Sequence, residues 1–143
     1  MITIYTDGAC SGNPGIGGWG AIIIDGKNTP ISLNGGEENT TNNRMELCAA
    51  INAISYFETK QNLEIFTDSK YLKDGIESWI HKWKLNNWKT TAKKPVKNKD
   101  LWLQLDNEIN RHNIKWNWVK GHSENIYNEK ADLLARKYIE ENN

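Results

Sequence analysis

The spacing of apolar residues changes along the chain, and this change constrains the fold more than any other feature. Three apolar runs come first, at residues 2–6, 19–24 and, more weakly, 31–33. The spacers between them are short and rich in turn residues, which favours three antiparallel strands in a meander. Apolar residues then recur every three or four positions from Leu47 to Phe57, which predicts a helix over about 43–57.

The second half of the chain alternates between strand and helix patterns. LEIFTDS predicts a buried strand that ends at Asp68, and KYLKDGIESWI predicts a helix after it. The spacing of Leu101, Leu105 and Ile109 predicts another helix, IKWNWVKGH alternates as a strand, and residues 131–139 predict a last helix. A strand, helix, strand series needs a crossover and therefore parallel pairing. We predict an α/β fold in which a mixed five-stranded sheet, three antiparallel strands and then two parallel ones, carries packed helices.

Length and composition favour one domain over residues 1–143. No segment approaches the roughly 20 apolar residues that a membrane helix needs. The first residues, MITIY, look like structure and not like a secretion signal, so we expect a cytoplasmic protein with no membrane partner. Cys10 and Cys48 lack the spacing of a metal or redox site, and we assign them neither a disulfide nor zinc.

The charge of the chain is unevenly distributed although its formal net charge is zero. Residues 78–99, which we call the lysine-rich segment, contain seven lysines and no Asp or Glu, so the rest of the chain is net acidic. Trp79, Trp83 and Trp88 lie among these lysines. Lysines neutralise phosphates and aromatic rings pack on sugars or bases, so the segment is a candidate nucleic-acid surface.

Four acids are predicted to converge. Asp7 and Asp68 end the first and fourth strands, and these two acids share one edge of the sheet if the strands are parallel neighbours. Glu46 is expected in the first turn of its helix and Asp132 near the start of the last helix. Converging carboxylates repel one another and recruit a hard cation, so their oxygens suggest magnesium or manganese. A pair of such ions suits in-line displacement at a phosphodiester.

Each acid also has a purely structural role open to it. Asp7 with Gly8 is common turn chemistry, and Asn43 with Glu46 has nearly the spacing of a capping box. Asp68 and Ser69 could cap the next helix, and Asp132 could be an ordinary first-turn acid. The functional interpretation therefore depends on whether the four carboxylates meet.

The motifs resemble those of a known family. YTDGACSGNPG, TTNNRMEL, IFTDSKY, WKTTAKKPVKNKDLW, and WVKGH followed by NEKADLLA are similar, in order, to the motifs of bacterial-type ribonuclease HI over residues 2–138. The resemblance implies the RNase H-like fold and metal-dependent hydrolysis of the RNA strand of RNA–DNA hybrids, leaving 5′-phosphate and 3′-hydroxyl ends. It also implies two Mg²⁺ ions, for which Mn²⁺ can substitute, and a monomer without an obligate protein partner.

The resemblance also assigns roles to residues. Asp7, Glu46, Asp68 and Asp132 correspond to the metal-coordinating carboxylates, and His122 to a loop histidine that assists catalysis or product departure. Small polar groups that match minor-groove contacts are Cys10, Gly12, Asn13, Asn42, Asn43 and Ser69. Thr41 and Asn98, with Arg44 nearby, match positions that hold a DNA phosphate, and the lysine-rich segment resembles a protrusion that holds the DNA strand through Trp83, Lys84, Trp88 and Lys89.

Several of these candidate nucleic-acid contacts also suit purely structural roles. The asparagines and Gly12 fit turns and helix caps, and Trp79 and Trp102 are expected to be structural. Lys70 is a further candidate nucleic-acid contact: it stands where the family often has glutamine, and it would add a phosphate contact or perturb contacts to base edges. The loop SENIYNE after His122 lacks a glycine that the family often carries.

Two other function classes compete with the nuclease. A catalytically silent hybrid-binding module would keep the lysine-rich segment but lose carboxylates, and all four are present. A DNA-cutting polynucleotidyl transferase would share the fold and the acidic site, but such enzymes lack this lysine-rich segment and carry other domains. Hydrolysis of a hybrid is therefore the function that we expect.

Overall fold

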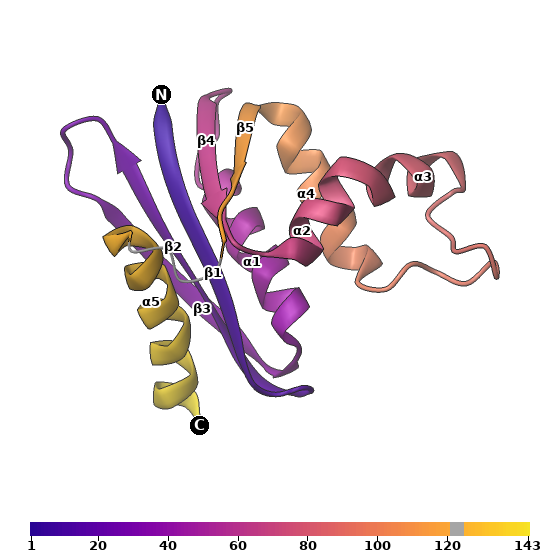
Figure 1. Ribbon diagram of the computed structural model, residues 1–143, viewed down its shortest axis with the longest axis horizontal. Coiled ribbons are helices and arrows are strands. Elements are labelled where there is room, and N and C mark those ends of the chain that lie inside the picture. The colour runs from indigo at the N-terminus through magenta and orange to yellow at the C-terminus, as the bar shows by residue number, and fades with distance from the viewer. Residues whose placement is uncertain (121–124) are drawn as a thin grey trace.

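The computed structural model describes residues 1–120 and 125–143. Within these ranges the elements follow in the order β1 (Ile2–Gly12), β2 (Gly15–Asp25), β3 (Ile31–Thr40), α1 (Asn42–Ser55), β4 (Asn62–Thr67), α2 (Lys70–Asp74), the π-helical turn η1 (Gly75–Trp79), α3 (Ile80–Leu85), α4 (Lys99–Arg111), β5 (Asn113–Trp118) and α5 (Ile126–Asn142). Figure 1 shows the helices packed around one twisted sheet.

The described strands form one mixed sheet in the order β3-β2-β1-β4-β5. β1 pairs antiparallel with β2, and β2 pairs antiparallel with β3. β4 lies parallel to β1 on one side and to β5 on the other. This arrangement confirms the predicted α/β fold and the division into antiparallel and parallel halves.

β1 is longer than the sequence predicts. The strand continues past Asp7 to Gly12, because residues 7–12 pair with residues 15–20 of β2. The expectation that the strand ends at Asp7 is therefore wrong. The parallel pairing of β1 with β4 nevertheless stops at Tyr5 opposite Phe66, so Asp7 still lies just beyond the parallel part of the sheet.

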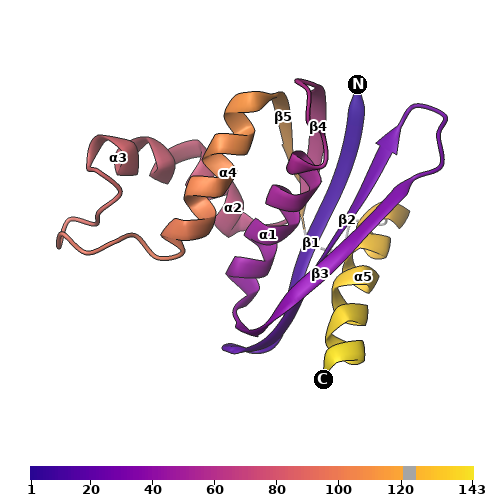
Figure 2. The same ribbon diagram turned by 180° about the vertical axis from the view of Figure 1, so that it is seen from behind.

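Helices cover both faces of the sheet. α5 lies on one face in Figure 1, and α1 lies on the opposite face in Figure 2, with α4 beside it. Successive residues of β1 point to opposite faces, as the pleat of a strand requires. Ile4 packs in the core cluster that includes α1, whereas Tyr5 packs with Ile22 of β2 and Ala131 of α5. The helix predicted over 43–57 is confirmed as α1, shifted by one or two residues.

The helix predicted after β4 forms as three successive helical pieces, α2, η1 and α3. The chain then runs through residues 86–98 to α4, and Figure 1 shows this region extending away from the sheet. Four non-glycine residues between β4 and α4 have positive φ angles: Asn87, Trp88, Lys93 and Asn98. No helix within the described ranges has the length and apolar character needed to cross a bilayer.

α5 packs directly on the backbone of β2. A Cβ atom at Gly20 would lie 2.2 Å from the carbonyl oxygen of Ala131, and one at Gly18 would lie 2.1 Å from that of Ala135. Both distances are far below van der Waals contact, so only glycine permits this approach. The position of α5, and of every side chain that it carries toward the sheet, depends on these two glycines.

We predict that Gly20→Ala lowers the free energy of unfolding by about 2 kcal/mol, because the added methyl group overpacks a contact between backbones. Urea titration measures this change. Gly26→Ala is the control, since no atom lies within 4 Å of its Cβ and only its φ of +60° opposes the substitution. Its cost should be about 1 kcal/mol. A Gly20→Ala protein as stable as the control variant would contradict the packing argument.

Candidate active site

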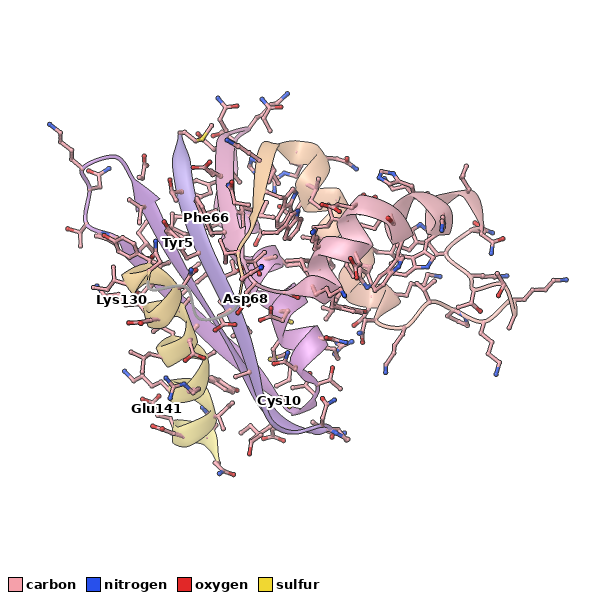
Figure 3. All side chains as sticks on the ribbon, in the orientation of Figure 1. Tyr5, Cys10, Phe66, Asp68, Lys130 and Glu141 are labelled. Atoms are coloured by element: carbon pink, nitrogen blue, oxygen red, sulfur yellow. The ribbon has the colours of Figure 1, made fainter. Side chains whose placement is uncertain are left out.

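Three carboxylates meet at the carboxyl end of the parallel strands. Asp7 belongs to β1, Glu46 to α1, and Asp68 directly follows β4. One ligand oxygen from each lies within 4.8 Å of those of the other two. Figure 3 shows Asp68 near the middle of the molecule, where the chain leaves β4. The structure therefore brings together three of the four acids predicted to converge.

Gly8 lets Glu46 reach this position. A Cβ atom on Gly8 would lie 2.6 Å from the backbone nitrogen of Glu46 and 2.7 Å from the carbonyl carbon of Met45. α1 can therefore approach β1 closely only because residue 8 has no side chain. Glu46 is the fifth residue of α1, so its expected place in the first turn is wrong by one turn.

The helix caps also differ from the sequence prediction at α1. Thr41 is the N-cap, and its hydroxyl accepts a hydrogen bond from the backbone N–H of Arg44 at 3.2 Å. The alternative capping box of Asn43 with Glu46 is therefore not the cap. Ser69 caps α2 by accepting a hydrogen bond from the N–H of Leu72, as predicted for the Asp68–Ser69 pair. Asp68 directly precedes this N-cap residue and is exposed.

Burial and mutual repulsion make Asp7 and Glu46 hard to ionise. Burial, followed by the nearby charge of Asp68, raises the pKa of Asp7 to about 7. Glu46 is only 5% exposed. Burial, then the charges of Asp7 and Asp68, raises the pKa of Glu46 well above its ordinary value. The Oε1 atom of Glu46 has no hydrogen-bond partner among the described residues.

A hard divalent cation fits this donor set. The three residues offer oxygen ligands and no sulfur or nitrogen, which is the preference of Mg²⁺ and Mn²⁺. A cation would offset the repulsion that raises the two pKa values and would occupy the lone pairs of a buried oxygen that lacks a partner. The fit rests on the chemistry of the donors and on the unpartnered Oε1 of Glu46.

Asp132 borders the three carboxylates without joining them. It lines the same open depression, about 480 Å³ in volume, as Asp7, Glu46 and Asp68, but it is not a member of the close group. Asp132 is the seventh residue of α5, and the first turn contains Glu129 instead, so the alternative of a first-turn acid is wrong. The Oδ2 atom of Asp132 accepts a hydrogen bond from Nε of Arg136 at 2.9 Å and forms an ion pair with Nη2 of the same side chain at 2.9 Å.

Several predicted nucleic-acid contacts surround the carboxylates. The minor-groove candidates Asn42, Asn43 and Ser69 line the depression, and so does Lys70. Tyr71 lines it too, and the sequence reasoning missed this residue, although its place directly after Lys70 in the motif was a usable signal.

Cys10, Gly12 and Asn13 lie further along, at the end of β1 and the turn that follows it. Figure 3 shows Cys10 far from Asp68 along this strand. The Oδ1 atom of Asn13 accepts a hydrogen bond from the backbone N–H of Asn42 at 3.3 Å, which connects this turn to the start of α1. The Cys10 thiol donates to the carbonyl oxygen of Thr40. These three residues therefore extend the polar surface beside the depression.

Arg44 is held by acidic partners on two elements. Its guanidinium donates to both carboxylate oxygens of Asp100, at 3.1 and 3.0 Å, and to Glu37 at 3.2 Å. It also donates to Oδ1 of Asn98, whose own amide nitrogen donates to the hydroxyl of Tyr71. The predicted phosphate-site residue Asn98 is therefore oriented from two sides, and Arg44 already has ion-pair partners.

The lysine-rich segment presents most of its lysines to solvent, but three of the predicted contacts are less free than expected. Lys84 forms an ion pair with Asp106 at 2.9 Å. Trp83 and Trp88 are half-buried, since Trp83 contacts Trp88 and the fully buried Trp102. The expectation that Trp102 is structural is confirmed. Lys89 is exposed, as are Lys93 and Lys94. His122 lies outside the described residues.

We predict that Asp7→Asn stabilises the metal-free protein at high pH. Wild-type Asp7 keeps its proton up to a pKa of about 7 when folded, whereas the unfolded chain releases it near 3.8. Wild-type stability therefore falls as pH rises from 4 to 7 and levels off above. The variant should gain roughly 4 kcal/mol at pH 8 and little near pH 4. Thermal melts in chelator measure the difference, and an equal gain at both pH values would contradict ionisation of Asp7 as its cause.

Comparison with known proteins gives the family of the chain. The RNase H family model matches residues 1–140. Ribonuclease H of Ehrlichia canis (strain Jake) is 55% identical over 138 residues, which cover 96% of this chain and 94% of that protein. LC9-RNase H1, a type 1 RNase H with the type 2 active-site motif, is 32% identical with a TM-score of 0.82, covering 95% of this chain and 70% of that one. LC11-RNase H1, which was solved in complex with RNA/DNA hybrid, is 22% identical with a TM-score of 0.73. This match covers 99% of this chain and 98% of that one. The chain therefore belongs to the RNase H family.

Proposed function

We propose that this protein hydrolyses the RNA strand of RNA–DNA hybrids and leaves 5′-phosphate and 3′-hydroxyl ends. The observation that carries the proposal is the close group of Asp7, Glu46 and Asp68 in a chain of the RNase H family. Relatives named ribonuclease H match nearly the whole chain, and a structural neighbour has been solved with an RNA/DNA hybrid. This kinship supports the substrate class, and the close group of three carboxylates supports the proposed role of these acids.

The four acids are proposed as ligands of two Mg²⁺ ions, with Mn²⁺ as a substitute. Bound ions of this kind lower the pKa of an attacking water, orient the scissile phosphate and offset the charge that develops at phosphorus. Asp7 and Glu46 favour such binding because their carboxylates are buried together and repel each other. Asp68 is the exposed member of the close group and adds a third carboxylate to the same set of ligands.

His122 is proposed to move a proton or to assist departure of the product phosphate. The support is its place in the family motif WVKGH and the ordinary pKa of histidine, which lies near neutrality. The side chain could therefore act both as an acid and as a base at physiological pH.

Recognition of the hybrid is proposed to use the surface around the depression. Hybrids differ from duplex DNA in their 2′-hydroxyl groups and shallow minor groove. A protein that recognises them therefore needs small polar side chains that approach the groove closely. Asn42, Asn43 and Ser69 meet this need beside the carboxylates, and Cys10, Gly12 and Asn13 extend the same surface. Lys70 adds a positive charge at the depression that suits a backbone phosphate.

The DNA strand is proposed to contact Thr41, Arg44, Asn98 and the lysine-rich segment. The network through Arg44 and Tyr71 orients the Asn98 amide, which supports a preformed phosphate contact. The exposed lysines supply most of the positive charge. Trp83 and Trp88 support the segment mainly by packing, with their exposed edges available to a strand.

We further propose one RNase H domain over residues 1–143, acting as a cytoplasmic monomer. The family model spans residues 1–140, which supports a single unit. Free Cys10 and Cys48 are compatible with a reducing compartment. Neither the oligomeric state nor the compartment enters the proposed reaction.

The function is tested with end-labelled RNA–DNA hybrid, duplex RNA, duplex DNA and single-stranded RNA, each with Mg²⁺, Mn²⁺ or chelator. We expect metal-dependent internal cuts only in the RNA of the hybrid. Asp7→Asn should lower the cleavage rate at least 100-fold while hybrid affinity changes less than about threefold, because the substitution removes a ligand charge with little change of shape. Asp25→Asn, an exposed acid at the end of β2, is the matched control and should cleave normally.

Two outcomes would overturn the proposed function. Wild-type protein that binds hybrid with Mg²⁺ but never cuts it would be a silent binding module. Near-normal cleavage by Asp7→Asn would show that the carboxylate group is not the site.

A second prediction concerns the lysine-rich segment. Replacing Lys89, Lys93 and Lys94 together by Ala should weaken hybrid binding about 10-fold or more and reduce the slope of log affinity against log salt concentration, because fewer counterions are released. Fluorescence anisotropy at several salt concentrations measures both quantities. The matched control replaces three exposed lysines elsewhere: Lys27, Lys60 and Lys137. An equal loss in the control would indicate a general charge effect and not a contact surface.

A further inference from the structure

Asp132 differs from the other three acids because a basic side chain already holds it. Nε of Arg136 donates a hydrogen bond to its Oδ2 atom at 2.9 Å, and Nη2 forms an ion pair with the same oxygen at 2.9 Å. Among the described residues, no Lys, Arg or His forms an ion pair with Asp7, Glu46 or Asp68. One carboxylate of the proposed set is therefore neutralised by the chain itself.

The pair is better placed than an ordinary surface pair on a helix. Isolated ion pairs at this spacing contribute little because water screens them. The side chain of Asp132 is only 24% exposed, however, and two guanidinium nitrogens of Arg136 each lie 2.9 Å from one of its oxygens. For a cation that binds Asp132, one carboxylate oxygen is already paired with Arg136, and the positive charge of this guanidinium lies nearby. Arg136 must either share the carboxylate or leave it.

The geometry also explains why only three acids form the close group. Asp132 lines the depression beside the other acids, yet its carboxylate is engaged by Arg136 one helical turn further along α5. α5 is fixed on β2 by the contacts of Gly18 and Gly20 with its backbone, so the helix itself has little freedom to shift. Whether Asp132 contacts Arg136 or another partner therefore depends on the conformations of side chains and not on a shift of the helix.

We propose that Arg136 is a positioning residue that restrains Asp132 and weakens the binding of a divalent cation at this acid in the absence of nucleic acid. The inference rests on the proposed function, which makes Asp132 a metal ligand. Cation binding by the close group of Asp7, Glu46 and Asp68 does not depend on Arg136. The protein then has one position that binds a cation readily, at the close group, and one at Asp132 that needs a higher cation concentration.

Calorimetric titration of the full-length protein with Mn²⁺ alone tests the proposal without any cleavage. Arg136→Gln should tighten the weaker binding event about threefold to fivefold, which is the size expected for losing one partly shielded ion pair. The affinity of the tighter Mn²⁺ binding event should be unchanged. Arg136→Lys keeps the charge and should remain close to wild type.

Two controls separate this pair from a general effect of charge. Lys137→Gln removes the same charge from the next residue of α5, where the lysine lies 3.8 Å from Glu141, and should leave both events unchanged. In an Asp132→Asn background, Arg136→Gln should produce no tightening, because the restrained carboxylate is gone.

Three results would overturn the inference: unchanged or weaker Mn²⁺ binding in Arg136→Gln, an equal shift in Lys137→Gln, or tightening that persists with Asp132→Asn. Failure of the proposed function is seen separately, as wild-type protein that takes up Mn²⁺ in this titration and yet leaves the hybrid uncut.

Discussion

The close approach of α1 to β1 at Gly8 is the contact on which the rest of the site depends. Because residue 8 has no Cβ, the helix backbone can lie against the strand and bring Glu46 beside Asp7. Glu46 is then removed from water with one oxygen unpartnered among the described residues, next to two further carboxylates. Such an arrangement is unfavourable for the chain alone and becomes favourable when a cation supplies the missing charge.

The sheet supplies the other two members of the group. Parallel pairing of β1 with β4 ends at Tyr5 and Phe66, so both strands present their next acids, Asp7 and Asp68, at the same place. Beyond this point β1 continues with β2 alone, and the turn after β1 reaches back to Asn42 at the start of α1. The positions of Asp7 and Asp68, and of the polar turn beside them, therefore follow from one change in strand pairing.

α5 adds the fourth acid from the opposite face of the sheet. The helix is held by backbone contacts at Gly18 and Gly20, so its position is determined by packing and not by the charges that it carries. Asp132 lines the depression, and it also lines a second hollow on α5 together with Arg136. The site thus combines three carboxylates that lack an ion-pair partner among the described residues with one that has such a partner, and this asymmetry is a property of side chains on a single helix.

The sequence by itself determined the order and type of the elements, because strand and helix periods are local properties of the chain. It also identified the four acids and the lysine-rich segment, since these lie in motifs of contiguous residues. Only the tertiary structure decided that β1 continues past Asp7, that Arg44 is held by Asp100, that Lys84 is paired with Asp106, and that Arg136 holds Asp132. The extension of β1 depends on its pairing with the next strand, the two ion pairs of Arg44 and Lys84 join residues distant in the sequence, and the last depends on which of several possible partners a side chain meets in space. Local spacing contains none of this information.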